Sequence, residues 1–170
     1  STIDISSNYK NKIKRDYINS KIQIEKILKK EYEKKTFDRV FILRLPAIIG
    51  KKCNENFISS TLKNLKLNKD IQLWGYKKKY NNFIHIDDIN LLISKLLKFN
   101  YKKLKYINIS SNGNYTLKSL ILFMKNQLKS QSKIILKDPS SIQKIYFKNK
   151  DYFHFQDCKK VLKKFVYENK

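Results

Sequence analysis

The chain has 170 residues and a formal net charge of +24, because 38 lysine and arginine residues face 14 acidic ones. A basic excess of this size is typical of nucleic-acid-binding proteins. Only Arg15, Arg39 and Arg44 are arginine, however, the residue whose planar fork suits phosphate and base recognition. The 41% hydrophobic content excludes a disordered chain, and no apolar run approaches the ~20 residues of a membrane span.

The lysine content has a simple explanation in the rest of the composition. Lysine is accompanied by many Asn, Ile, Tyr and Phe residues, while the chain has 3 Gly and 2 Pro. These abundant residues are encoded by A/T-rich codons, so we ascribe the charge to a compositional bias. A lysine-rich nucleic-acid-binding module is kept as an alternative, and we regard nucleic acid as an improbable partner.

The two cysteines carry information about the compartment. Cys53 and Cys158 lie far apart and lack the spacing of metal ligands, so we expect two free thiols in a reducing, cytoplasmic setting. Neither His85 nor His154 forms a zinc pattern with them, and no bound metal is expected.

The hydrophobic periodicity predicts elements that alternate in type. In chain order these are a helix over 16–35 with Ile24, Ile27 and Leu28 on one face, a strand over 40–45 covered on both faces, a helix over 55–65, and strands over 71–74 and 83–86. A helix after Asp87, a strand over 106–109, a helix over 117–128, a strand over 134–136 and a helix over 161–166 follow. The alternation indicates an α/β class with parallel strands.

Two helix starts are marked by capping residues. Asp87 and Asp88 offer an N-cap for a helix whose apolar stripe runs at helical spacing. Thr116 is expected to cap the helix over 117–128.

Tyr17 and Lys21 form the most specific chemical motif. Four residues span slightly more than one helical turn, so both side chains project from one face. A phenol ordinarily loses its proton near pH ~10, and a neighbouring ammonium favours the phenolate. The pair is therefore a plausible acid/base unit for a hydroxyl or carbonyl oxygen. A solvated helix face is the alternative, because tyrosine and lysine are both abundant here.

Five short motifs occur along the chain in an order that is more specific than any one of them alone. The Tyr17–Lys21 helix is followed by the segments RVFILRLPAIIG over 39–50, IQLWG over 71–75, NFIHIDD over 82–88 and YINIS over 106–110. Together they resemble the second half of the extended short-chain dehydrogenase/reductase family, the NAD-dependent sugar-nucleotide epimerases and dehydratases. That family shows a Tyr–Lys helix, then LRxxNVYG, hVDD and YNIGS. The resemblance runs from the first residues to about Gln127.

The resemblance implies a fold and a division into parts. It implies the C-terminal part of a Rossmann-type parallel sheet with a small α/β substrate-binding lobe. Residues 1–50 would end the Rossmann-type domain, and 51–170 would form the lobe, interleaved with the last Rossmann strand at about 104–110. The family's N-terminal glycine-rich βαβ unit is absent, because Gly50, Gly75 and Gly113 are far apart. We therefore expect little or no catalysis from this chain alone.

The resemblance also implies catalytic roles with NAD or NADP as cofactor. Tyr17 would exchange a proton with a sugar hydroxyl, and Lys21 would hydrogen-bond the nicotinamide ribose. The third catalytic hydroxyl of the family falls on Thr2, with Ser6 and Ser7 as the alternative. The backbone around Pro46 would lie beside the nicotinamide.

The implied substrate is a nucleotide sugar, with departures from the family pattern. Ala47 stands where the family has a substrate-binding Asn, and Asn81 stands where many members have a phosphate-binding Arg. Asn56 would contact the diphosphate, while Trp74 would either pack against the base or be a core aromatic. Lysines 77–79 could supply the missing charge.

The remaining expectations concern role and assembly. The two Asn before FIHIDD resemble a subgroup of polysaccharide-biosynthesis oxidoreductases. We expect His85 to be a packed strand residue and Asp87 a helix cap. A homodimer through the Tyr–Lys helix would place Ile18 and Ile22 at the interface. A non-catalytic scaffold of the same fold is a further alternative.

Overall fold

A computed structural model describes residues 12–98, 100, 102–137, 146 and 153–170. The helices are α1 (Lys12–Glu33), α2 (Phe57–Lys66), α3 (Ile86–Leu97), α4 (Leu117–Leu128) and α5 (Cys158–Glu168). The strands are β1 (Arg39–Arg44), β2 (Ala47–Ile49), β3 (Ile71–Trp74), β4 (Phe83–His85), β5 (Lys103–Asn108) and β6 (Ile134–Lys137). Each element expected from the periodicity is present, with ends shifted by a few residues.

The described strands form three parallel pairs. Strand β1 pairs with β5, β2 with β4, and β3 with β6. Each pair joins strands that are separated in sequence by at least one helix, as a parallel connection requires. The predicted α/β class with parallel strands is thus confirmed.

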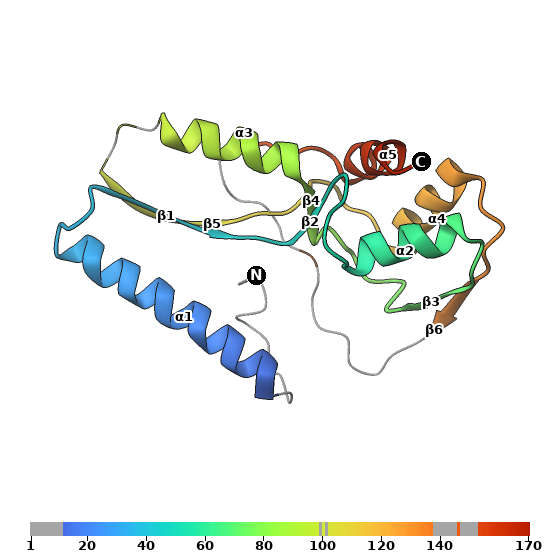
Figure 1. Cartoon of the computed structure of the whole chain (residues 1–170), viewed down its shortest axis with the longest axis horizontal. Helices are drawn as coiled ribbons and strands as arrows, with labels where there is room; N and C mark the ends of the chain where they lie inside the picture. The colour runs from blue at the N-terminus through green and yellow to red at the C-terminus, as the bar shows by residue number, and fades with distance from the viewer. Residues whose placement is uncertain (1–11, 99, 101, 138–145, 147–152) are drawn as a thin grey trace.

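Helices cover the β1–β5 pair on both sides. Figure 1 shows α1 along one side of these strands and α3 along the other. On the α3 side, Ile89 and Leu92 pack with Phe41 and Leu43 of β1 in one hydrophobic cluster. The alternating side chains Val40 and Ile42 are also buried. Strand β1 is therefore apolar on both faces, as its sequence predicts.

A second hydrophobic cluster lies between α2, α4 and α5. Its fully buried side chains include Leu73 of β3, Leu120 of α4 and Phe165 of α5. Ile49 at the end of β2 belongs to the same cluster. The chain thus builds one core around β1 and β5 and another around the three helices.

The start of α3 corrects one expectation. His85, not Asp87, is the N-cap, because its Nδ1 accepts the backbone N–H of Asp87 at 3.2 Å. Asp87 and Asp88 fall in the first turn of the helix, where negative charge still complements the helix dipole. Thr116 caps α4 as predicted, since its side chain accepts from Ser119 N–H.

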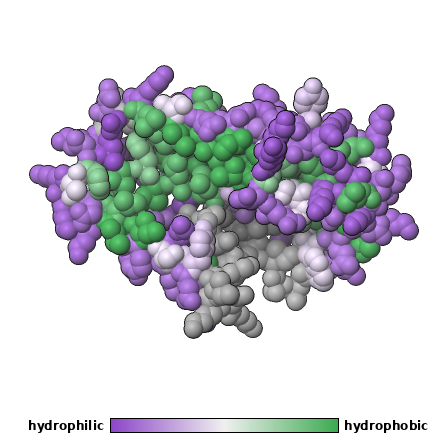
Figure 2. Space-filling model, viewed as in Figure 1, coloured by the Kyte–Doolittle hydropathy of each residue, from purple (hydrophilic) through white to green (hydrophobic). Residues whose placement is uncertain are grey.

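The orientation of α1 also differs from expectation. Ile24 and Ile27 are 48% and 58% exposed, whereas Ile18 and Glu25 are buried. The expectation that Ile18 faces a partner is therefore wrong. Figure 2 shows a broad apolar area in the half of this view where Figure 1 draws α1, β1, β5 and α3.

Candidate functional site

Tyr17 and Lys21 lie together on α1. The Nζ of Lys21 is 5.2 Å from the centroid of the Tyr17 ring, a distance at which an ammonium is attracted to an aromatic face. Tyr17 is 47% exposed, so about half of its surface is accessible to solvent. The structure therefore brings the predicted acid/base pair into contact.

The connection from α1 to β1 determines which end of the strand Tyr17 faces. A short segment joins the C-terminus of α1 to the start of β1, and the helix runs back along the strand (Figure 1). The first turns of α1 consequently lie toward the carboxyl end of β1. Ligands of open parallel α/β sheets bind at the carboxyl ends of their strands, which is the end where Tyr17 lies.

An ion pair fixes α1 against the sheet. The Nε and Nη2 of Arg44, the last residue of β1, donate to the two carboxylate oxygens of Glu25 at 3.2 and 2.8 Å. The guanidinium also lies 5.2 Å from the centroid of the Tyr106 ring on β5. Hydrogen bonding to Glu25 raises the pKa of Arg44 above its ordinary value, opposed by partial burial. These two residues were not among the sequence candidates.

The chain between β1 and β2 forms the next part of the site. Pro46 is buried and Ala47 is half-buried, with Ala47 paired to Phe83 across the β2–β4 ladder. A cavity of about 330 Å³ follows directly, lined by residues 48–54 and Ile86. The start of the predicted substrate segment thus lines a concave surface, which begins two residues after Pro46 in the chain.

Asn56 has a structural role at the start of α2. Its Oδ1 accepts the backbone N–H groups of Ile58 and Ser59, and the Ser59 hydroxyl accepts the Asn56 backbone N–H. This reciprocal arrangement is a capping box. The predicted diphosphate contact by Asn56 is untested, but its side-chain oxygen is already engaged in the cap.

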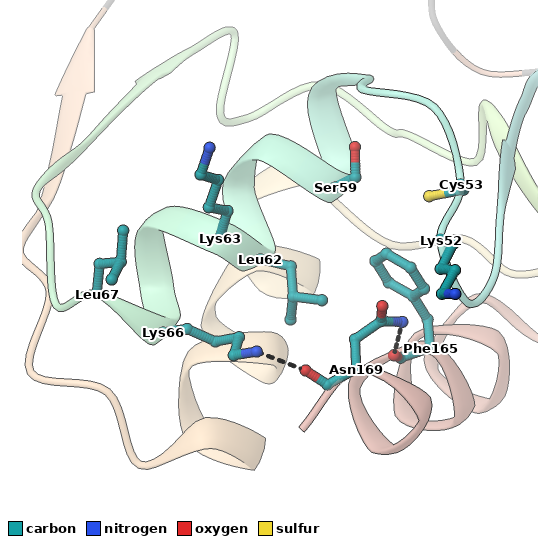
Figure 3. Close-up of a pocket in the computed structure, with 9 residues that line it drawn as sticks. All are labelled: Lys52, Cys53, Ser59, Leu62, Lys63, Lys66, Leu67, Phe165 and Asn169. Carbon is teal, nitrogen blue, oxygen red and sulfur yellow. Dashed lines mark hydrogen bonds between the residues drawn. The ribbon is translucent and has the colours of Figure 1, made fainter.

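A second cavity, of about 320 Å³, lies between α2 and the end of α5 (Figure 3). Leu62 and Phe165 form its apolar floor, and Cys53 lies in the loop that precedes α2. The lysines at 52, 63 and 66 also line it, and the Lys66 ammonium donates to the Asn169 carbonyl at 2.7 Å. The cavity therefore combines an apolar floor with positive charge.

Asn81 and Trp74 differ in their accessibility. Asn81 is 2% exposed, and its amide donates to the Ser110 hydroxyl at 3.2 Å and the Ser111 carbonyl at 3.1 Å. Asn81 therefore connects the segment before β4 to the segment that follows β5, inside the protein. Trp74 is 51% exposed, so the alternative of a core aromatic is wrong.

His85 lies in a cluster of charges between α3 and α5. Its Nε2 is 3.0 Å from a Glu168 oxygen, and the ligand atoms of His85, Asp87 and Glu168 all lie within 4.8 Å of one another. The Lys164 ammonium bonds Asp87 and lies 3.9 Å from Glu168. A lysine thus supplies positive charge where a metal would. His85 is a buried strand residue, as expected.

The remaining candidate falls outside this geometry. Thr2, with its alternatives Ser6 and Ser7, lies outside the described residues.

None of the helices in the described part of the chain combines the length and the apolar character that a membrane crossing needs. One sequence signal could have identified the Arg44 site, namely the occurrence of an arginine in a chain whose basic residues are nearly all lysine.

Known structures share this fold. The chain aligns with UDP-N-acetylglucosamine 4-epimerase from Methanobrevibacter ruminantium, solved in complex with UDP-N-acetylmuramic acid, at a TM-score of 0.74 and 18% identity over 90% of this chain and 53% of that one. The Bacillus cereus UDP-N-acetylglucosamine 4-epimerase aligns at a TM-score of 0.71 and 18% identity, over 89% of this chain and 52% of that one. The Bacillus anthracis dTDP-glucose 4,6-dehydratase, solved in complex with NAD, aligns at a TM-score of 0.71 and 17% identity, over 89% of this chain and 50% of that one.

These alignments establish the Rossmann-like fold, and the chain spans about half the length of the solved structures that it matches. Comparison of the sequence with curated proteins gives no match. The model of the NAD dependent epimerase/dehydratase family matches residues 4–110, which include the Tyr17–Lys21 helix and strands β1 to β5. The chain therefore belongs to the NAD dependent epimerase/dehydratase family.

Proposed function

We propose that the chain is part of an NAD(P)-dependent enzyme that alters a nucleotide sugar by oxidation or reduction at a sugar carbon. The observation that carries this proposal is the Tyr17–Lys21 contact on an exposed face of α1, in a chain of the epimerase/dehydratase family. The enzymes named above are a dTDP-glucose 4,6-dehydratase and UDP-N-acetylglucosamine 4-epimerases, which supports the substrate class.

In this proposal Tyr17 exchanges the proton. Its phenolate oxygen takes the proton of a sugar hydroxyl as that carbon is oxidised to a carbonyl, and it returns a proton when the carbonyl is reduced. When bound, the nicotinamide accepts or supplies the hydride. Lys21 stabilises the phenolate by its charge and donates to the ribose, and the Thr2 hydroxyl orients the substrate oxygen.

The cavity bordered by residues 48–54 fits a cofactor or sugar at this position. It follows Pro46 and Ala47 without a break and lies at the end of β2, where parallel α/β proteins bind ligands. Pro46 would border the nicotinamide. The exposed ammonium groups of Lys51 and Lys52 lie on the same loop and are suited to an anionic diphosphate.

The nucleotide would be held further along the lobe. The half-exposed ring of Trp74 on β3 offers a stacking surface for a base. Because the Asn81 side chain is buried and hydrogen-bonded, the exposed lysines 77–79 are better placed to meet the phosphates. Residues 1–50 would then belong to the Rossmann-type domain that binds the cofactor. Residues 51–170 would form the substrate-binding lobe, interleaved with the last Rossmann strand at about 104–110.

Assembly and setting complete the proposal. The apolar side chains Ile24 and Ile27 of α1 are exposed, which supports a homodimer through this helix. Cys53 and Cys158 are free thiols, consistent with a reducing cytoplasm. The resemblance of the segment before β4 to polysaccharide-biosynthesis oxidoreductases supports a role in polysaccharide synthesis.

The single tryptophan makes the substrate part of the proposal directly measurable. Trp74 is the one Trp in these 170 residues, so the fluorescence of this chain should be quenched when UDP or dTDP binds to it. Free N-acetyltryptophanamide with the same nucleotides is the control for inner-filter effects, and the Trp74→Phe variant gives the background signal. Separately, UDP- and dTDP-sugars are incubated with NAD⁺ or NADP⁺, and products are analysed by mass spectrometry. Conversion of at least one sugar is expected, and neither quenching nor conversion with any of them would contradict the proposal.

A further inference from the structure

Glu25 lies on the same face of α1 as the Tyr17–Lys21 pair. Residues four apart on a helix are neighbours, so Glu25 follows Lys21 by one turn and Tyr17 by two. Glu25 is 9% exposed. A buried carboxylate next to the lysine would ordinarily attract the lysine ammonium, because opposite charges at this spacing form ion pairs.

Arg44, rather than Lys21, pairs with the Glu25 carboxylate. Two guanidinium nitrogens bond its two oxygens at 3.2 and 2.8 Å, the paired geometry that an arginine fork provides and a single ammonium does not. The Lys21 Nζ, in turn, lies 5.2 Å from the centre of the Tyr17 ring. The carboxylate and the ammonium on this face thus have different partners.

The position of Arg44 is itself determined by the sheet. Arg44 ends β1, in register with Asn108 of β5, and its guanidinium lies over the Tyr106 ring. It is one of three arginines among 38 basic residues. An arginine at this point supplies the planar fork that the abundant lysines lack. This supports a role for the two-point contact in fixing the Glu25 carboxylate.

We propose that Arg44 is a positioning residue for the Tyr17–Lys21 pair: by holding the Glu25 carboxylate against the end of β1, it leaves the Lys21 ammonium to Tyr17. Arg44 touches neither substrate nor cofactor in this role and acts through Glu25. The inference deepens the proposed function and rests on it, since it concerns the chemistry of the same pair.

Three variants, made in the whole enzyme of which this chain is a part, distinguish a positioning role of Arg44 from simple support of the fold. Arg44→Met frees the Glu25 carboxylate to attract Lys21, and kcat should fall about tenfold or more, part of the roughly 10²–10⁴-fold that acid–base groups contribute, with little change in KM. Glu25→Gln removes the competing charge, so kcat should be retained although the protein is less stable. The double variant should recover most of the kcat that Arg44→Met loses.

The result that would overturn the proposal is a double variant as slow as Arg44→Met. Loss of kcat in Glu25→Gln would do the same, since both outcomes are expected of an ion pair that only supports the fold. Thermal denaturation of each variant identifies any that is unfolded. If Arg44→Met does not fold, Arg44→Lys takes its place, because one ammonium cannot hold both oxygens, and a partial loss of kcat is then expected.

A second readout does not depend on turnover. In NMR spectra of the protein without substrate, nuclear Overhauser effects between the Lys21 side chain and the Tyr17 ring should be present in the unsubstituted protein and the double variant, and lost in Arg44→Met. Unchanged effects in Arg44→Met would refute the positioning role. Failure of the proposed function has a different signature, namely absence of turnover with this NMR pattern intact.

Discussion

The Nε2 of His85 donates a hydrogen bond to Glu168 across a separation of 83 positions, at 3.0 Å. The tautomer follows from the other ring nitrogen, since Nδ1 accepts the backbone N–H of Asp87, which leaves the proton on Nε2. One buried side chain thus caps α3 and binds the end of α5. Lys164 extends the cluster by bonding Asp87.

The Asp87–Lys164 pair predicts a pH dependence of stability. The hydrogen bond from Lys164 lowers the pKa of Asp87 below its ordinary 3.8. The stabilisation is therefore complete above this value and disappears as the pH falls through the lower pKa of the folded state. Urea denaturation should show a stability difference between the unsubstituted protein and Asp87→Asn at pH 7 that vanishes in strong acid. An equal difference at both pH values would contradict this assignment.

Phe165 should be a major contributor to the stability of the helical core. It is 1% exposed among side chains of α2, α4 and α5. Phe165→Ala removes a buried aromatic ring and should lower the free energy of unfolding by about 3–5 kcal/mol. The matched control is Tyr167→Ala on the same helix, where the ring is 78% exposed and a change within about 0.5 kcal/mol is expected. Similar losses in both variants would show that α5 is not packed as described.

The two thiols should differ in reactivity. Burial, followed by the charge of Asp157, raises the pKa of the Cys158 thiol to about 12, so almost no thiolate forms at neutral pH. Cys53 is partly exposed beside a cavity. Alkylation of the native protein should modify Cys53 first, with Cys158 reacting once the protein unfolds. Peptide mass spectrometry checks the order, and the Cys53→Ser variant should be inert in the native state.

Gly113 should not tolerate a side chain. Its φ is +118°, and an added Cβ would lie 2.5 Å from the Tyr115 ring and 2.9 Å from an Asp157 oxygen. Gly113→Ala should disturb the Tyr115–Asp157 hydrogen bond and lower stability by roughly 1–3 kcal/mol. The exposed neighbour Asn114→Ala is the control. Equal thermal midpoints for both variants would contradict the described turn.

The local elements could be predicted from the sequence because their signals are local. The apolar run of β1, the stripe of α3 and the Thr116 cap depend on residues within a few positions of one another. The Tyr17–Lys21 contact follows from helical spacing in the same way. These predictions therefore agree with the structure, except that two residues of the α3 stripe, Ile93 and Leu97, are 41% and 74% exposed and do not face the core.

The features that depend on distant residues could not be predicted in this way. Glu25 reads as one more charge on a polar helix until Arg44, 19 positions later, covers it. Asn81 resembles a surface ligand until the serines at 110 and 111 accept from its amide. His85 becomes the cap of α3 because its ring reaches back to the Asp87 N–H, although aspartates are the more usual caps.

Replacement of the Tyr17 hydroxyl tests the central claim most directly. Turnover of a nucleotide sugar by the intact protein is compared between Tyr17→Phe and Tyr32→Phe, which removes a phenol hydroxyl from the other end of α1. We predict that Tyr17→Phe lowers kcat by about 10²–10⁴-fold, the usual contribution of an acid–base group, with unfolding unchanged, and that Tyr32→Phe has no effect. Turnover by Tyr17→Phe at the unsubstituted rate would contradict the account.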